Sequence, residues 1–184
     1  MATNFRGTWL TSSLRATRER GLLERYLERL PKRFHEPVLN SVVGEWLPVE
    51  VAVAHYEAMD QLRLPEDEII KIGLEVTERF HRGFYRTVFQ LAKAVGATPW
   101  TILAQTQKMW DRTWVGGGLA IWKSGPSLAR GHIVGWPCAR VPYCRVAMRG
   151  VMMGTVALFC KQALVSEIPG RCTDTELCYR MTWS

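Results

Sequence analysis

The sequence lacks a segment that could cross a membrane, and it lacks a secretory signal. Its uncharged run, residues 150–160, is too short for a bilayer, which requires about 20 apolar residues. Residues 1–7 contain no apolar core segment of the kind a signal peptide needs. With 47% hydrophobic and 22% charged residues, the composition is that of a globular protein. We therefore expect a cytoplasmic protein with no transmembrane segment.

Nucleic-acid-binding signatures are also absent. We find no zinc-finger spacing, no RNA-binding motif and no helix-turn-helix pattern. The net charge is only +7, from 24 Lys and Arg against 17 Asp and Glu. The basic residues between Arg15 and Arg33 are interleaved with Glu19, Glu24 and Glu28, which is typical of a solvated helix face with ion pairs. The sequence therefore predicts no nucleic-acid partner.

Enzyme motifs are equally scarce. Gly116-Gly117-Gly118 lacks the Lys-Ser/Thr of a phosphate-binding loop, and it follows a predicted helix, so it is better interpreted as a connector. No histidine forms a metal-binding pair or is placed to activate a cysteine as a nucleophile. The four histidines are His35, His55, His81 and His132. These absences favour a protein that is not an enzyme.

Hydrophobic periodicity predicts a helical first part. Residues 5–13 are mixed and contain Gly7, which argues against a long helix there. Apolar side chains recur every 3 or 4 positions in the segments that follow, and the pattern is cleanest from 66 to 95. A further helix is expected after Pro142; its residues 150–160 carry no charge, so we expect it to be buried on most sides. The predicted helices are 18–30, 48–62, 66–95, 98–114 and 142–165.

The second part changes to a period of two. Residues 119–123 and 128–134 are predicted strands joined by Ser124-Gly125-Pro126-Ser127, a hairpin signal, and residues 176–183 form a closing strand. Helices segregated from strands indicate an α+β fold. We expect one domain over residues 1–184, with a helical part at about 14–115 and the hairpin, helix and closing strand at about 117–184.

Glycines and aromatic residues define a candidate pocket. Gly150 and Gly154 share one helix face, and Gly73 and Gly83 lie near an apolar stripe, so each permits close approach of a helix or a ligand. Tryptophans flank the junction between helices and hairpin; ordinary core packing is the alternative explanation. The candidate pocket residues are Gly73, Phe80, Gly83, Phe84, Trp110, Trp114, Trp122, Gly150 and Gly154.

A metal site is a further hypothesis. Five cysteines are present, all in the last third, and we expect free thiols in a reducing compartment. Cys160, Glu167, Cys172 and Cys178 supply the thiolate and carboxylate ligands that zinc favours, although no two cysteines have Cys-x-x-Cys spacing. The alternative is a set of separate thiols, with Cys160 buried as a small apolar residue.

The order of several motifs resembles a paralogous family of myxobacterial proteins of unknown activity. These motifs are Trp46-Leu47-Pro48-Val49, Arg149-Gly150-x-x-x-Gly154 and Tyr179-Arg180-Met181-Thr182-Trp183. That family is distantly similar to the superfamily of 4-vinyl reductase domains, haem nitric-oxide-binding domains and Bet3-type transport subunits. The resemblance implies helices packed on a small antiparallel sheet, and an apolar pocket for haem, aromatic effectors or acyl chains.

Two departures from that superfamily bear on cofactors. The chain lacks the Tyr-x-Ser-x-Arg motif of the haem-binding branch, so we expect no haem. Glu167, Cys172 and Cys178 follow the order of a zinc cluster in the 4-vinyl reductase branch, but their spacing differs, so zinc stays an alternative.

The sequence thus predicts a non-enzymatic sensory domain. It would hold an apolar small molecule or acyl chain between the long helices and the sheet, and we expect it to form a homo-oligomer. A scaffold or dimerisation domain without ligand is the second hypothesis, and a zinc-binding domain is the third.

Overall fold

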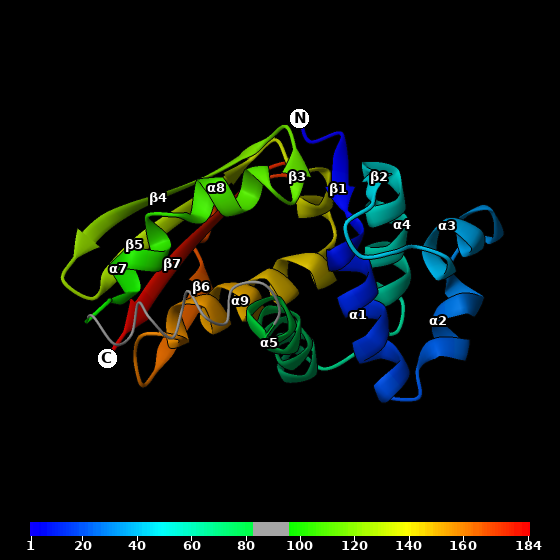
Figure 1. Ribbon diagram of the computed structural model, residues 1–184, viewed down its shortest axis with the longest axis horizontal. Helices are drawn as coiled ribbons and strands as arrows, with labels where there is room; N and C mark the ends of the chain where they lie inside the picture. Colours follow the sequence, from blue (N-terminus) through cyan, green and yellow to red (C-terminus); the bar gives the residue numbers. More distant parts are fainter. Residues whose placement is uncertain (83–95) are drawn as a thin grey trace.

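A computed structural model describes residues 1–82 and 96–184, and the side chains of residues 81 and 82 lie outside that description. Helices and a sheet form two layers, with most helices on one side (Figure 1). The first elements are β1 (Asn4–Arg6), α1 (Gly7–Glu19), α2 (Leu23–Arg29), η1 (Lys32–Phe34), α3 (His35–Leu39), β2 (Trp46–Pro48), α4 (Val49–Asp60) and α5 (Glu66–Arg82). The later elements are α7 (Pro99–Leu103), α8 (Thr106–Asp111), β3 (Trp114–Val115), β4 (Gly118–Gly125), β5 (Leu128–Val134), η2 (Pro137–Arg140), α9 (Pro142–Ala157), β6 (Ala163–Glu167) and β7 (Leu177–Trp183).

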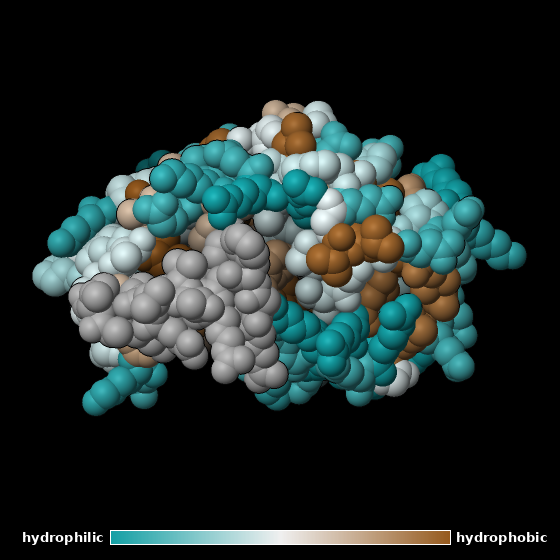
Figure 2. Space-filling view, viewed as in Figure 1, coloured by the Kyte–Doolittle hydropathy of each residue, from teal (hydrophilic) through white to brown (hydrophobic). Residues whose placement is uncertain are grey.

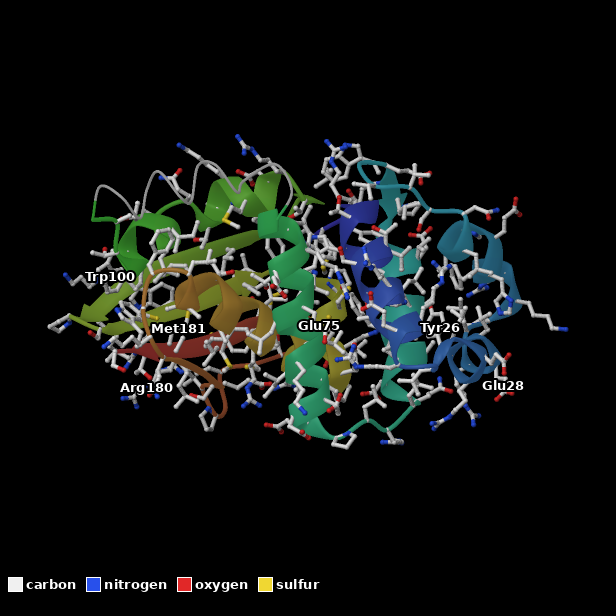
Figure 3. All side chains as sticks on the ribbon, turned by 60° about the horizontal axis from the view of Figure 1, so that its bottom comes forward. Tyr26, Glu28, Glu75, Trp100, Arg180 and Met181 are labelled. Carbon is white, nitrogen blue, oxygen red and sulfur yellow. The ribbon has the colours of Figure 1, made fainter. Side chains whose placement is uncertain are left out.

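A four-stranded antiparallel sheet with the order β4-β5-β7-β6 forms one layer. Side chains alternate across it, as the period-two pattern predicts. Ala129, Ile133, Tyr179 and Met181 are buried on the inner face, whereas Arg180 is exposed on the outer face. Met181 and Arg180 lie on opposite sides of β7 (Figure 3). The α+β prediction, the hairpin and the closing strand are confirmed.

Helices α5 and α9 cross beneath the inner face of this sheet (Figure 1). The predicted helix at 48–62 is confirmed as α4, which begins directly after Pro48. The predicted helix at 66–95 is confirmed as α5 up to Arg82, and residues 83–95 lie outside the described part. No helix among the described residues is long and apolar enough to cross a membrane.

The prediction for the N-terminal segment is wrong. Residues 5–13 were expected to lack a long helix, but α1 begins at Gly7. Its buried face includes small residues such as Ser13 and Thr17, which do not give a strong periodic signal. The Thr17 hydroxyl donates to the Ser13 carbonyl at 2.9 Å, so the helix satisfies this side chain internally. The predicted helix at 18–30 is interrupted at Gly21, which has a φ of 67°.

Two other helices are shorter than predicted. The segment 98–114 divides into α7, α8 and strand β3, which pairs with β1. The segment 142–165 forms α9 only to Ala157, after which β6 pairs with β7. Each predicted helix ends early because its last residues form a strand with a partner distant in sequence, of which local periodicity carries no signal. A small second sheet, β2-β1-β3, was missed for the same reason.

A candidate ligand-binding cavity

A cavity of about 1280 Å³ lies between α1, α5, α8, α9 and the inner face of the large sheet. Its mouth is visible as a hollow near the centre of the face in Figure 2. The volume exceeds that of an ordinary small-molecule pocket, about 300–1,000 Å³. Its deep wall is apolar and consists of Leu103, Leu119, Ile121, Met148, Val151, Met152 and Met181.

The periodicities of α9 and the strands place these side chains in the cavity. Met148, Val151, Met152 and Thr155 occupy positions i, i+3, i+4 and i+7, so they share one helix face. Leu119 and Ile121 are two apart on β4 and therefore share the inner side of the sheet. The Thr155 hydroxyl donates to the Val151 carbonyl at 2.9 Å, so its hydrogen bond is made within the helix. The wall therefore presents mainly apolar groups to the cavity, since the one hydroxyl on this helix face is already hydrogen-bonded.

Aromatic rings close one side of the cavity. The ring centroids of Trp9 and Phe80, which both line it, are 4.9 Å apart. Trp110 also lines the cavity and stacks on the buried Trp114 at 5.6 Å. Such aromatic pairs are rigid and bury a large area. This side of the cavity is therefore preformed.

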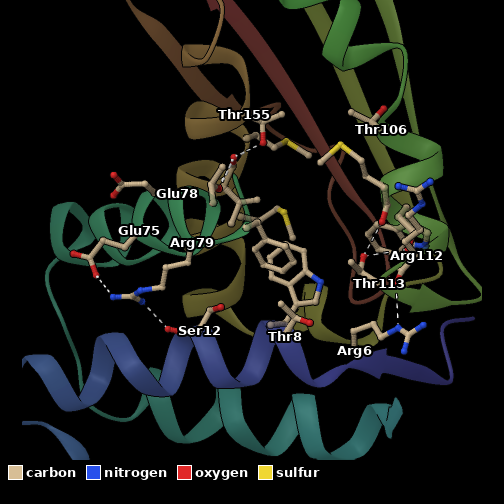
Figure 4. A pocket seen from close by; sticks show the side chains of 18 of the residues that line it. Arg6, Thr8, Ser12, Glu75, Glu78, Arg79, Thr106, Arg112, Thr113 and Thr155 are labelled. Atoms are coloured by element: carbon tan, nitrogen blue, oxygen red, sulfur yellow. Dashed lines mark hydrogen bonds and ion pairs between the residues drawn. The ribbon is translucent and has the colours of Figure 1, made fainter. Parts of the chain in front are cut away.

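Charged side chains are concentrated at the rim. At the end between α1 and α5, the Arg79 guanidinium donates to the Ser12 carbonyl at 2.7 Å (Figure 4). It also donates to the Glu19 carboxylate at 2.5 Å. Arg20 forms two hydrogen bonds with Glu75, at 2.7 and 3.0 Å, which raise the pKa of Arg20. Positive and negative groups therefore offset one another at this end.

The opposite end of the cavity carries Arg6 and Arg112 (Figure 4). The Arg6 Nε donates to the Arg112 carbonyl at 3.3 Å, its Nη1 donates to the Gly44 carbonyl, and its guanidinium carbon lies 4.1 Å from the centroid of the Trp46 ring. No carboxylate among the described residues pairs with Arg6. This end of the cavity is accordingly positive.

A buried polar cluster lies next to the cavity between α1, α2 and α4. The imidazole of His55 contacts the Tyr26 hydroxyl through Nδ1 at 2.7 Å and the Ser13 hydroxyl through Nε2 at 2.9 Å. Burial lowers the pKa of His55 to about 3, so the ring is neutral. Its contacts are enclosed by the core, and we assign the cluster a structural role.

Only some of the sequence-derived pocket residues line the cavity. Phe80 and Trp110 line the cavity. Gly73, Gly150 and Gly154 lie where α5 packs against α9, and Trp114 is buried among aromatic rings. Trp122 is 44% exposed on the outer face of the sheet. Gly83 and Phe84 lie outside the described residues.

Sequence reasoning missed the residues that form most of the cavity. The sequence-derived pocket residues include none of Met148, Met152, Met181 and Arg6, all of which line the cavity. Only the fold could show that the space between them is open.

The hypothesis of a zinc site is corrected by the structure. Glu167 is bound by Arg145, whose Nε donates to it at 3.1 Å. The Cys172 sulfur accepts from the Cys178 backbone N–H at 3.4 Å, and the Cys160 sulfur contacts the Gln162 carbonyl at 3.2 Å. Within residues 1–82 and 96–184, no group of three or more His, Cys, Asp or Glu side chains could hold a metal ion. The cysteines are separate free thiols.

Comparisons with known proteins find similarity in structure. No family model and no curated protein sequence matches the chain. The Fe(II) unliganded H-NOX protein from K. algicida has a TM-score of 0.70 at 11% identity, covering 97% of this chain and 96% of that one. The I5F mutant of the T. tengcongensis H-NOX protein has a TM-score of 0.66 at 13% identity, covering 97% of each chain.

These similarities overturn the expectation of no haem. A third similar structure, with a TM-score of 0.64 at 14% identity and coverage of 97% of this chain and 95% of that chain, comes from work on modulating haem redox potential through porphyrin distortion.

The residues of the cavity can be compared with what a haem group requires. The volume and the apolar wall of the cavity fit a porphyrin. Iron in haem proteins is usually held by His, Cys, Tyr or a His/Met pair. Among the described lining residues, only the thioethers of Met109, Met148, Met152 and Met181 could contact iron. The described part thus fits the porphyrin body better than the metal. At these low identities, the comparisons establish that the chain has the H-NOX fold.

Proposed function

We propose that the protein is a non-enzymatic sensory domain that binds a porphyrin-sized, largely apolar molecule in this cavity. The cavity carries the proposal, because it is large, apolar and bounded by two helices and a sheet. The solved structures of the same fold include haem proteins, which makes haem the first ligand to test. Occupancy would alter the packing around α5 and α9, and a change there could be transmitted as a signal.

Several features support binding over catalysis. The hydroxyls of four residues that line the cavity donate to backbone carbonyls, so these groups are already hydrogen-bonded; they are Thr77, Thr106, Thr113 and Thr155. His55 makes both its contacts within the core. No activated nucleophile lines the cavity among the described residues. The arrangement suits retention of a ligand.

Titration with haem and with metal-free protoporphyrin tests the proposal. Trp9 and Trp110 line the cavity, so ligand entry should quench tryptophan fluorescence. Haem binding should also produce a shifted, sharpened Soret band. If the protein holds only the porphyrin body, haem and protoporphyrin bind with similar affinity. If the protein also binds the iron, haem binds much more tightly than protoporphyrin. Failure of both compounds and of oleate to bind would refute the proposal.

A matched pair of variants tests the location. Ile121 on β4 lines the cavity, whereas the adjacent Ala120 is exposed on the outer face. Ile121→Trp should fill part of the cavity and weaken binding at least tenfold. Ala120→Trp adds a similar side chain to the same strand and should leave affinity unchanged. Equal effects of the two substitutions would place the ligand elsewhere.

Self-association is a separate proposal. We expect a homo-oligomer, and light scattering of the ligand-free and ligand-treated protein tests it directly. A monomer under both conditions would contradict this expectation without affecting ligand binding.

A further inference from the structure

We infer that the ligand of this cavity carries a carboxylate, and that Arg6 binds it. This inference rests on the proposed ligand-binding function and specifies the class of ligand. The observation behind it is a positioned arginine at one end of an otherwise apolar cavity, with no carboxylate partner among the described residues.

Arg6 is held in a fixed orientation. Two of its N–H groups donate to backbone carbonyls of Arg112 and Gly44, and its guanidinium plane lies over the Trp46 ring. A guanidinium has five N–H donors. Among the described residues, none accepts a hydrogen bond from Nη2, so Arg6 is oriented but not saturated. A preorganised fork of this kind matches the geometry of a carboxylate.

The distribution of charge around the cavity distinguishes Arg6 from Arg15 and Arg79, which also line it. The lining includes Arg6, Arg15, Arg79 and Arg112 against Glu19, Glu75 and Glu78. Arg15 and Arg79 pair with Glu19, and Arg79 also lies 3.5 Å from Glu75. Glu75 and Glu78 lie at the α1–α5 end, away from Arg6 (Figure 4), and Glu19 is paired with Arg79.

The nearest acidic residue in the adjoining loop is also engaged. The Glu45 carboxylate accepts from the Val42 backbone N–H at 3.1 Å and forms no ion pair with Arg6. The guanidinium of Arg6 is thus placed to pair with a negative charge that enters this end.

An amphiphilic acid fits this arrangement. Its apolar body would occupy the wall formed by Ile121, Met152 and Met181, and its carboxylate would reach the rim at Arg6. Porphyrins and fatty acids share this chemistry, since both join an apolar body to a carboxylate. Neutral hydrophobic molecules lack the second element.

Paired ligands test the inference. Binding of protoporphyrin IX is compared with that of its dimethyl ester, and binding of palmitate with that of methyl palmitate, by fluorescence quenching and calorimetry. We expect each acid to bind about 10- to 100-fold more tightly than its ester, the range of a charge-assisted hydrogen-bonded pair. Preference in only the porphyrin arm or only the palmitate arm identifies which acid the cavity accepts.

Variants assign the preference to Arg6. Arg6→Gln should lower acid affinity to that of the ester and leave ester affinity unchanged, and Arg6→Lys should restore part of it. Arg18→Gln removes the same charge from an exposed position on α1 and should preserve the preference. Thermal unfolding of each variant checks folding. Should Arg6→Gln fail to fold, Arg6→Lys provides the test. It should bind the acids more weakly than the wild type does and bind the esters equally well.

The outcomes separate the two levels of the argument. If acids and esters bind equally well, the inference is overturned while the ligand-binding function stands. If the preference survives in a folded Arg6→Gln variant, Arg6 is not the recognition residue. If no acid or ester binds, the proposed function itself fails.

Discussion

Gly73 and Gly150 face each other where α5 crosses α9. A Cβ atom at Gly73 would lie 2.2 Å from the Ala147 carbonyl oxygen and 3.0 Å from the Cα of Gly150. A Cβ atom at Gly150 would lie 2.2 Å from the Ile70 carbonyl oxygen and 3.0 Å from the Cα of Gly73. The two helix backbones are therefore in direct contact, and neither glycine can gain a side chain unless the helices separate.

Substitution of either glycine should be strongly destabilising. We expect Gly73→Ala and Gly150→Ala each to lower the free energy of unfolding by about 3 kcal/mol, because overlap with backbone outweighs the helix propensity of alanine. Gly154→Ala should cost less, since its Cβ would meet the Thr77 side chain at 3.0 Å. Urea denaturation measures the three values. A Gly73→Ala protein as stable as the wild type would show that the helices are not in contact.

The sequence contained part of this arrangement. The spacing of Gly150 and Gly154, and the position of Gly73 beside an apolar stripe, predicted close approach. The sequence could not identify what approaches, because the partner of Gly150 lies 77 positions away by residue number and no local pattern links them. The same glycines would permit close approach of another helix, of a ligand or of a second copy of the chain.

The neutral state of His55 should make stability depend on pH. Its pKa is about 3 in the folded protein, against 6.5 when exposed, so below pH 6.5 only the unfolded chain binds the extra proton. Stability should therefore fall as pH decreases from 6.5 to 5, by about 1.4 kcal/mol per unit and about 2 kcal/mol in all. Carboxylates contribute little in this window, because they titrate mainly below pH 5.

His55→Gln should remove this pH dependence. The variant should be less stable than the wild type at pH 7.5, because the contacts with Tyr26 and Ser13 are altered. Between pH 6.5 and 5, however, its stability should stay nearly constant. His35→Gln, at a partly exposed position, should retain the wild-type slope. An unchanged slope in His55→Gln would mean that another group titrates in this range.

The ion pair between Arg20 and Glu75 should stabilise the contact of α1 with α5. Both side chains are partly buried, at 20% and 33% exposure, and their two hydrogen bonds are parallel. A double-mutant cycle with Arg20→Gln and Glu75→Gln should give a coupling free energy of about 1 kcal/mol, the upper end for pairs near the surface. The exposed Lys71–Asp67 pair should show no measurable coupling. Equal coupling free energies for the two pairs would show that partial burial does not strengthen the Arg20–Glu75 pair.

Local patterns predicted the elements better than the cavity. Pro48 located the start of α4, and Ser124-Gly125-Pro126-Ser127 located the hairpin, because turn and cap chemistry acts over a few residues. Strands β1, β2 and β6 depend on distant partners and were missed. Phe80 and Trp110 were identified from aromatic content, but Arg6 was not, since its position at the rim depends on the pairing of β1 with β2 and β3.

Arg130 and Arg180 should destabilise the outer face of the sheet. They are directly paired across β5 and β7 and both are exposed, with no ion pair to either among the described residues. Like charges at such positions repel, whereas opposite charges contribute a few tenths of a kcal/mol up to about 1. Arg130→Glu or Arg180→Glu alone should therefore raise the free energy of unfolding by about 0.5 kcal/mol. The double substitution restores repulsion and should lose that gain, which separates the pair interaction from effects of net charge.

Urea denaturation at low salt measures all three variants, and the differences should shrink at 1 M salt, where charges are screened. Additive gains in the double variant would show that the two side chains do not interact.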